Sequence, residues 1–178
     1  MPENLMPEDL LPEKNIPDIA QLLGAMISYY KGDPRRIHHF IKVHDLARTI
    51  GILEGLDDNE LYVLEAAAAV HDIGIHICEL KYGRCDGQLQ EEEGPELARD
   101  MLTALGFDQE VILRVCWLVA HHHSYHSIDG WDHQILIEAD MLVNLYEDSA
   151  SHEKIESALE NIFISQTGKL FLRKMFDL

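Results

Sequence analysis

From Pro17 to the end of the chain, apolar residues recur three and four positions apart, and this spacing constrains the fold more than any other feature. Such a period places apolar side chains along one face of an α-helix, whereas a half-buried strand alternates at every second residue. No stretch combines that alternation with enrichment in β-branched residues. The pattern therefore predicts an all-α fold, a single compact bundle of about six to eight helices with essentially no sheet.

Start and stop signals divide this pattern into segments. Aspartates suited to helix N-termini are Asp33, Asp57, Asp108 and Asp132. Glycines suited to helix C-termini are Gly32, Gly55, Gly74 and Gly106. Together these signals predict helices at residues 17–30, 34–54, 58–71, 90–105, 108–122, 132–147, 152–164 and 168–176.

Prolines recur every five residues at the start of the chain, at Pro2, Pro7, Pro12 and Pro17. Because proline interrupts helices, residues 1–16 are predicted to form an extended or turn-rich arm ahead of a helical bundle at 17–178. The apolar residues of this arm could lie on the body of the protein or on a second subunit, which would make a homo-oligomer. A loosely ordered terminus is the other interpretation.

Length and cysteine content indicate one domain in a reducing compartment. The 178 residues are enough to bury a core without disulfides. The chain has three cysteines, an odd number that includes no CxxC pair, which argues against a disulfide framework or a zinc ribbon. The acidic start is unlike a secretory signal, and no apolar run approaches the roughly 20 residues that span a bilayer. A cytoplasmic protein is predicted.

The chain is strongly acidic, with 14 Lys and Arg against 32 Asp and Glu and a formal net charge of −18 at pH 7. Binding to duplex nucleic acid or to an anionic membrane begins with basic side chains that displace counterions. The acidity therefore argues against both partners. A phosphorylated small molecule would need local attraction from a metal ion and a few basic residues.

The segment RRIHHFIKVHDLA holds three histidines, which helix geometry separates. His39 begins an apolar stripe that continues, at steps of four and three, through Val43, Leu46, Ile50 and Leu53. At about 100° per residue, His38 lies about 100° away from His39 and His44 about 140° away. Only His39 is predicted to face the core, and the His44-Asp45 pair lies off the stripe.

A second histidine-aspartate pair closes the alanine-rich segment LEAAAAVHDIG. Leu64, Ala68 and His71 recur at steps of four and three, which turns His71 inward. Asp72 follows where the helix is about to end at Gly74, so two consecutive side chains can converge there.

The segment ILIEADMLVNLY surrounds Asp140 with apolar residues. Burial of a carboxylate is costly unless the carboxylate is paired or binds a metal, whereas Glu138 is expected to reach solvent. Two imidazoles and two carboxylates from different helices form a nitrogen and oxygen donor set for a divalent metal, with positions left open.

The chain resembles the HD superfamily of metal-dependent phosphohydrolases in the order and sequence context of His39, the His71-Asp72 pair and Asp140. The resemblance covers roughly residues 34–148. It implies that these residues form the core of an HD-type helical bundle. It implies that these four residues bind Mn, Mg, Fe, Co, Ni or Zn, with one ion expected and two as the alternative. The implied activity is hydrolysis of a small phosphoester, a nucleotide or other phosphomonoester.

The run VAHHHSYH is similar to the region in which two-metal HD proteins place further ligands. By that analogy His121 and His122 are candidates for a second metal and for catalysis, and the apolar stripe that ends at His122 favours it independently. His123 and His126 are expected to line a wet cleft.

The match to two-metal members is incomplete at one position. Those members have a histidine four residues before a glycine, where this chain has Gln90 before Gly94. A full second site is therefore in doubt, unless a glutamate of residues 91–93 replaces the histidine.

Contacts to phosphate must be found away from the HD pair, because Ile75 replaces the lysine that many family members have there. Arg36 lies three residues before His39 and shares its face, so it is the first candidate to bind phosphate and to act in catalysis. Other basic candidates are Arg35, Lys42, Lys81 and Arg84, the last two on a loop expected to follow the HD pair. The expected catalytic set is Asp72, Arg36, His121 and His122.

Two other functions stay open. A minority of HD proteins are diiron oxygenases, which the histidine cluster permits and Gln90 argues against. A non-catalytic metal-binding or ligand-binding regulator would keep the same fold, but four intact ligands weigh against it. No residue can be recognised as a contact to a nucleotide base or sugar, so the sequence does not predict which phosphoester is the substrate.

Overall fold

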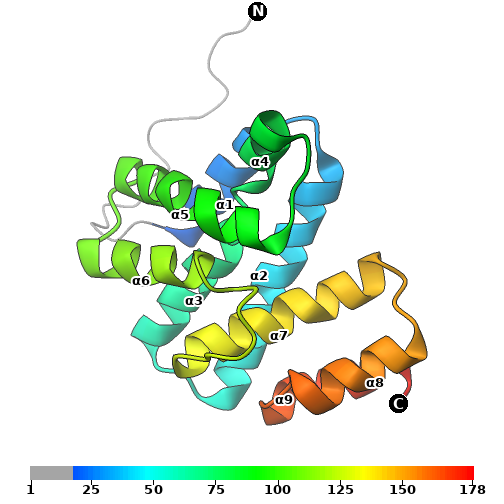
Figure 1. Ribbon diagram of the computed structural model, residues 1–178. Helices are drawn as coiled ribbons and strands as arrows, with labels where there is room; N and C mark the ends of the chain where they lie inside the picture. The colour runs from blue at the N-terminus through cyan, green and yellow to red at the C-terminus, as the bar shows by residue number, and fades with distance from the viewer. Residues whose placement is uncertain (1–17) are drawn as a thin grey trace, which may run out of the picture.

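The computed structural model describes residues 18–178, and every regular element in that range is a helix (Figure 1). The predicted all-α fold class is confirmed, and the arm predicted for residues 1–16 lies outside the described residues. The nine helices of the described range are α1 (Ile19–Tyr29), α2 (Pro34–Glu54), α3 (Asp58–Val70), α4 (Ile75–Tyr82), α5 (Gly87–Ala104), α6 (Gln109–Val119), α7 (Gly130–Glu147), α8 (His152–Asn161) and α9 (Gln166–Phe176).

The N-terminal caps of α2 and α3 fix the two helices that carry His39 and His71. The Asp33 carboxylate accepts a hydrogen bond from the backbone N–H of Arg36, and Pro34 occupies the first turn. Asp57 forms a capping box with Glu60 at the start of α3. These short-range contacts set where each helix begins and therefore which face each histidine occupies.

Helix α3 lies at the centre of the bundle and contacts α1, α2, α6 and α7. Its four consecutive alanines, residues 66–69, are fully buried, so small side chains allow neighbouring helices to approach from several sides. Helix α2 packs along both α3 and α7, while α5 and α6 form a second pair (Figure 1). The end of α3 therefore delivers His71 into the middle of the protein.

One helix was not predicted. Residues 75–82 form α4, where a loop was expected, and α5 begins at Gly87 rather than at residue 90. Gly74 adopts a helical conformation and begins α4 instead of only ending α3. A Cβ atom at Gly74 would lie 3.0 Å from the backbone nitrogen of Gly94, so the glycine permits close packing of α5 against this turn.

One segment has the length and apolar composition of a membrane span, although no such segment was predicted. By length and composition alone, Asp58–Tyr82 is long and apolar enough to cross a bilayer. It comprises α3, the turn after it and α4, and 56% of its apolar window is buried inside the protein. This burial is what the core helix of a folded domain shows.

Glu138 is fully buried, contrary to the expectation that it reaches solvent. Its carboxyl accepts hydrogen bonds from Gln134 Nε2 at 2.8 Å, from the Ile164 N–H at 2.7 Å and from the Ser165 N–H at 2.8 Å. The Ser165 hydroxyl also donates to it. A Cβ atom at Gly168 would collide with Glu138 Oε2, so the glycine makes room for this contact. The carboxyl therefore joins α7 to the start of α9.

Replacement of Glu138 by alanine should lower the free energy of unfolding by about 3 kcal/mol, because several buried donors would lose their acceptor. Urea unfolding measures this change. Glu96→Ala is the matched control, since the Glu96 side chain is 79% exposed and its loss should change stability by less than about 0.5 kcal/mol. Equal effects of the two substitutions would contradict the proposed role of Glu138.

Candidate metal centre

Three side chains from three helices meet in the core. His39 from α2, His71 at the end of α3 and Asp140 from α7 are all buried. His39 Nε2 lies 3.3 Å from His71 Nε2 and 3.2 Å from Asp140 Oδ1, and His71 Nε2 lies 3.5 Å from the same oxygen. Two imidazole nitrogens and a carboxylate oxygen at this separation can share one metal ion.

Asp72 lies between this group and a second one. Its Oδ2 is 3.4 Å from His39 Nε2 and 3.5 Å from His71 Nε2, while its Oδ1 is 3.7 Å from His122 Nε2. With His122 and His123, Asp72 forms a second group of potential ligands. The carboxylate of the HD pair therefore offers one oxygen to each group.

The chemistry of the second group fits a cation. His122 is fully buried, and its Nε2 has no hydrogen-bond partner within the described residues. A buried ring nitrogen without a partner is costly, and a metal ion would satisfy it. The residues present therefore fit a metal at both groups.

His121 does not reach either group, which corrects its prediction as a ligand and catalytic residue. Its ring stacks on Trp117 with centroids 4.1 Å apart, and its Nδ1 donates to the Trp117 carbonyl at 2.7 Å. The cause is local: α6 ends at Val119, and His121 lies in the turn that follows, with its ring held against the last turn of the helix. His122 is buried, as the apolar stripe of this segment predicts. His123 joins the second group instead, and His126 is exposed.

Charges within the groups shift their pKa values strongly. Burial lowers the pKa of His71, but Asp72 and Asp140 outweigh burial and raise it to about 9. Burial raises the pKa of Asp72, but His71 and His122 outweigh burial and lower it to about 2. The pKa of Asp140 is held well below its usual range by His39 and His71, against the effect of burial. Both carboxylates are therefore ionised at neutral pH.

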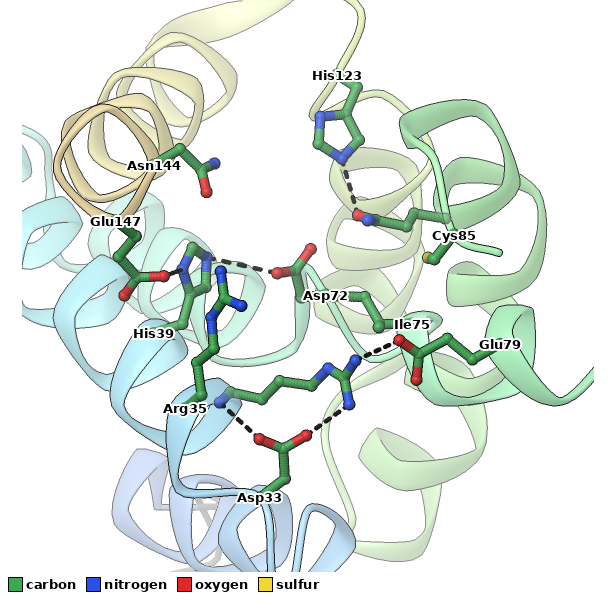
Figure 2. Close-up of a pocket in the computed structure, with 12 residues that line it drawn as sticks. Asp33, Arg35, His39, Asp72, Ile75, Glu79, Cys85, His123, Asn144 and Glu147 are labelled. Atoms are coloured by element: carbon green, nitrogen blue, oxygen red, sulfur yellow. Dashed lines mark hydrogen bonds and ion pairs between the residues drawn. The ribbon is translucent and has the colours of Figure 1, made fainter. Parts of the chain in front are cut away.

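A pocket of about 320 Å³ opens over these groups (Figure 2). Figure 2 shows His39, Asp72 and His123 around one cavity, with Asn144 and Glu147 on the α7 side. A cavity of this size accommodates a small molecule. A ligand in it can therefore reach both groups of potential metal ligands.

The basic residues of the pocket differ from the prediction. Arg36 lines the pocket, but its guanidinium is paired with Asp33 at 2.5 Å and with Glu79 at 2.6 Å. Arg35 also lines the pocket, is exposed, and has no ion pair within the described residues. Figure 2 shows its side chain extending beside the His39 ring. Arg35 is therefore the basic group that is available to a ligand.

Lys81 and Arg84, both predicted to bind substrate, do not line the pocket. The unexpected α4 carries Lys81 toward α5, where it pairs with Glu93 at 2.6 Å. Arg84 pairs with Asp86 at 2.7 Å on the connection between these helices. Both predictions assumed a loop after the HD pair. Helix α4 replaces that loop at Lys81, and the short connection that carries Arg84 places it outside the pocket lining.

The other histidine-aspartate pair lies away from the site, as its position off the apolar stripe predicts. His44 Nε2 is 3.3 Å from Glu65 Oε1, and Arg48 Nε donates to the same oxygen at 3.0 Å. His44 and Asp45 line a separate hollow beside Tyr146. Neither residue belongs to the two groups of potential ligands.

Several residues around the site were not predicted. Asn144 donates to Asp140 Oδ1 at 2.8 Å, one helical turn away, a spacing that the sequence could have indicated. His123 Nε2 donates to Gln90 Oε1 at 2.8 Å, and Glu91 accepts from the His123 N–H at 3.0 Å. Gln90 and Glu91 of α5 thus hold the histidine loop, residues 120–129 between α6 and α7, and only the tertiary structure shows this.

Comparison with known proteins agrees with this geometry. The HD domain family matches residues 36–156, which include all four candidate ligands and the histidine loop. This protein belongs to the HD domain family. The matched range also extends beyond residue 148, to the start of α8.

The fold of this HD domain has a counterpart among solved structures. It is similar to the crystal structure of a predicted HD superfamily hydrolase from an uncultured Thermotogales bacterium, with a TM-score of 0.64 and 24% sequence identity. The similarity covers 91% of this chain and 87% of that chain. At this identity it supports the fold alone. No curated protein matches the chain.

The metal content of this HD domain should depend on one histidine-aspartate pair and not on the other. His71→Ala or Asp72→Ala should abolish tight metal binding, because each removes a donor at the centre of the site. His44→Ala and Asp45→Ala are matched controls and should leave the metal content per chain unchanged. Elemental analysis after purification with Mn²⁺ measures it. Loss of metal in His44→Ala, with metal retained in His39→Ala, would contradict this assignment.

Proposed function

We propose that this HD domain is a metal-dependent phosphohydrolase that acts on a small phosphoester, a nucleotide or other phosphomonoester. The observation that carries the proposal is an open pocket in which buried imidazoles and ionised carboxylates face Arg35, an arginine without an ion pair among residues 18–178. Such a pocket combines a cation site with a basic group for an anionic ligand. Family membership supports the reaction class.

His39, His71, Asp72 and Asp140 would hold the metal, which could be Mn, Mg, Fe, Co, Ni or Zn. When bound, a divalent ion supplies Lewis-acid polarisation of a phosphoryl oxygen and lowers the pKa of coordinated water. The nitrogen and oxygen donors present suit any of these metals.

Arg35 orients the phosphate in this proposal. Its guanidinium is free to form a bidentate contact with two phosphate oxygens, and it stands at the mouth of the pocket beside His39. Arg36 instead holds the pocket wall together through its pairs with Asp33 and Glu79. Because acidic residues also line the pocket, a bound cation would add to the attraction of Arg35 for phosphate.

His123 positions water rather than protonating the leaving oxygen. Burial and the neighbouring His122 lower the pKa of His123 to about 4, so its imidazole is neutral at neutral pH. Its Nε2 donates to Gln90, which leaves the Nδ1 lone pair as an acceptor for a water proton. A neutral histidine held in this way can orient water, while its low pKa makes it a poor base.

A cytoplasmic location and a small-molecule substrate complete the proposal. Cys78, Cys85 and Cys116 are all free thiols, which suits a reducing compartment. The net charge of −18 at pH 7 argues against duplex nucleic acid and anionic membranes as partners.

A diiron oxygenase is the second candidate, and the position of Asp72 favours it. Because its two carboxylate oxygens face different groups of histidines, Asp72 could bridge two ions. Gln90, where two-metal relatives have histidine, is engaged with His123 and weighs against this reading.

Arg35→Ala should lower kcat/KM for a phosphomonoester about 10- to 100-fold, because a charge-assisted hydrogen bond contributes about 1.5–3 kcal/mol. Metal content should not change, since Arg35 is not a potential ligand. Arg84→Ala is the matched control and should retain full activity, because Arg84 lies outside the pocket. Steady-state kinetics on a panel of phosphomonoesters with Mn²⁺ or Fe²⁺ measures both variants. Equal rates for Arg35→Ala and the unaltered protein would remove Arg35 from the proposal.

The number of metal ions separates the two candidate functions. One ion per chain should support hydrolysis, and His122→Ala should lower turnover more than it lowers metal content. His126→Ala is the control and should change neither, because His126 is exposed and lies outside both groups of potential ligands. Two irons per chain, oxygen consumption in the presence of substrate and loss of one iron in His122→Ala would instead identify the oxygenase.

A further inference from the structure

Three histidines of the site share one arrangement: Nε2 faces the group of ligands, and Nδ1 contacts an oxygen. His71 Nδ1 lies 2.9 Å from the Ala68 carbonyl oxygen, and His122 Nδ1 lies 2.8 Å from the Val119 carbonyl oxygen. His39 Nδ1 instead lies 3.1 Å from the Glu147 carboxylate. His39 is therefore the one of these three with a charged partner.

Helix geometry explains the difference. His71 and His122 follow the last residues of α3 and α6, where backbone carbonyls have no partner inside the helix. Each of these histidines can therefore bond to a carbonyl three residues earlier. His39 lies within α2, where the nearby carbonyls are used by the helix itself. Its Nδ1 needs an acceptor from another element, and α7 provides Glu147.

Glu147 is itself held in place. It lies seven residues after Asp140, two turns along α7, so the same face of this helix presents both carboxylates to His39. Lys42, three residues after His39 on α2, donates to the other carboxylate oxygen. The Glu147 side chain is only 15% exposed. Both of its oxygens are therefore engaged, and its orientation is defined.

We propose that Glu147 is a positioning residue that fixes the ring orientation of His39 and its Nδ1–H tautomer, so that the Nε2 lone pair is directed at the metal. Lys42, considered from the sequence as a phosphate contact, orients Glu147 in turn. The assignment rests on the metal site of the proposed function but not on hydrolysis. Outer-shell partners of ligating histidines typically change metal affinity 10- to 100-fold when removed.

The chain offers a matched control for this assignment. Glu65 also contacts a histidine of α2, with its Oε1 3.3 Å from His44 Nε2, and its side chain is likewise 15% exposed. His44 is outside both groups of ligands. Glu147→Ala and Glu65→Ala therefore each remove a carboxylate that lies beside a histidine of α2, at equal exposure. Only His39 is hydrogen-bonded to its carboxylate, and only Glu147 lies beside the groups of potential ligands.

Titration of the metal-free full-length protein with Co²⁺ tests the proposal. Glu147→Ala should weaken Co²⁺ binding about 10- to 100-fold. Glu147→Gln should lose less, because its amide oxygen still accepts from Nδ1. Glu65→Ala should bind Co²⁺ like the unaltered protein. In the proton NMR spectrum of the Co²⁺ form, the shifted signal of the His39 Nδ1 proton should disappear through exchange with water in Glu147→Ala and persist in Glu65→Ala.

Two results would overturn the assignment: unchanged Co²⁺ affinity and an unchanged spectrum in Glu147→Ala, or an equal loss of affinity in Glu65→Ala. Urea unfolding of both variants shows whether they are equally folded. If the unaltered protein binds Co²⁺ as expected but hydrolyses no phosphoester, the assignment of Glu147 stands and the proposed function fails. If the unaltered protein binds no Co²⁺, the metal site and this assignment fail together.

Discussion

The rest of the structure depends on the need to compensate a carboxylate buried at the centre of the bundle. Asp140 is 3% exposed, and an isolated charge at such a position would be strongly destabilising. His39 and His71 lie within 3.5 Å of its Oδ1, and Asn144 donates to the same oxygen. Three helices must therefore meet at one point, which accounts for the central position of α3 and for the packing of α2 along α7.

The histidine loop after α6 is held by a different set of contacts, outside the buried centre. Trp117 stacks on His121 and lies under the Arg114 guanidinium at 4.7 Å, and Arg114 pairs with Asp129 and Asp132 at the start of α7. These contacts occupy one side of the loop, and His122, its buried residue, turns toward Asp72 on the other side. A surface network of this kind orders potential ligands without contact with the metal site.

Much of the fold and part of the site could be predicted from the sequence, because they depend on local geometry. The spacing of apolar residues determines which face of a helix is buried, so the inward position of His39 and the separation of His44 follow from α2 alone. The caps at Asp33 and Asp57 act over three residues and could be read in the same way. The apolar surroundings of Asp140 predicted its burial, though not that of Glu138.

Only the tertiary structure decided which partner each buried or surface side chain contacts. Glu147 reaches His39 across 108 positions, and no periodicity encodes such a contact. Arg36 shares the face of His39 as predicted, but the unexpected α4 supplies Glu79 as its partner and leaves Arg35 available. The sequence by itself thus determined the helices and their buried faces, because those depend on neighbours within a turn. Packing between segments distant in the sequence decided which side chains contact one another across helices, and therefore which residues line the pocket.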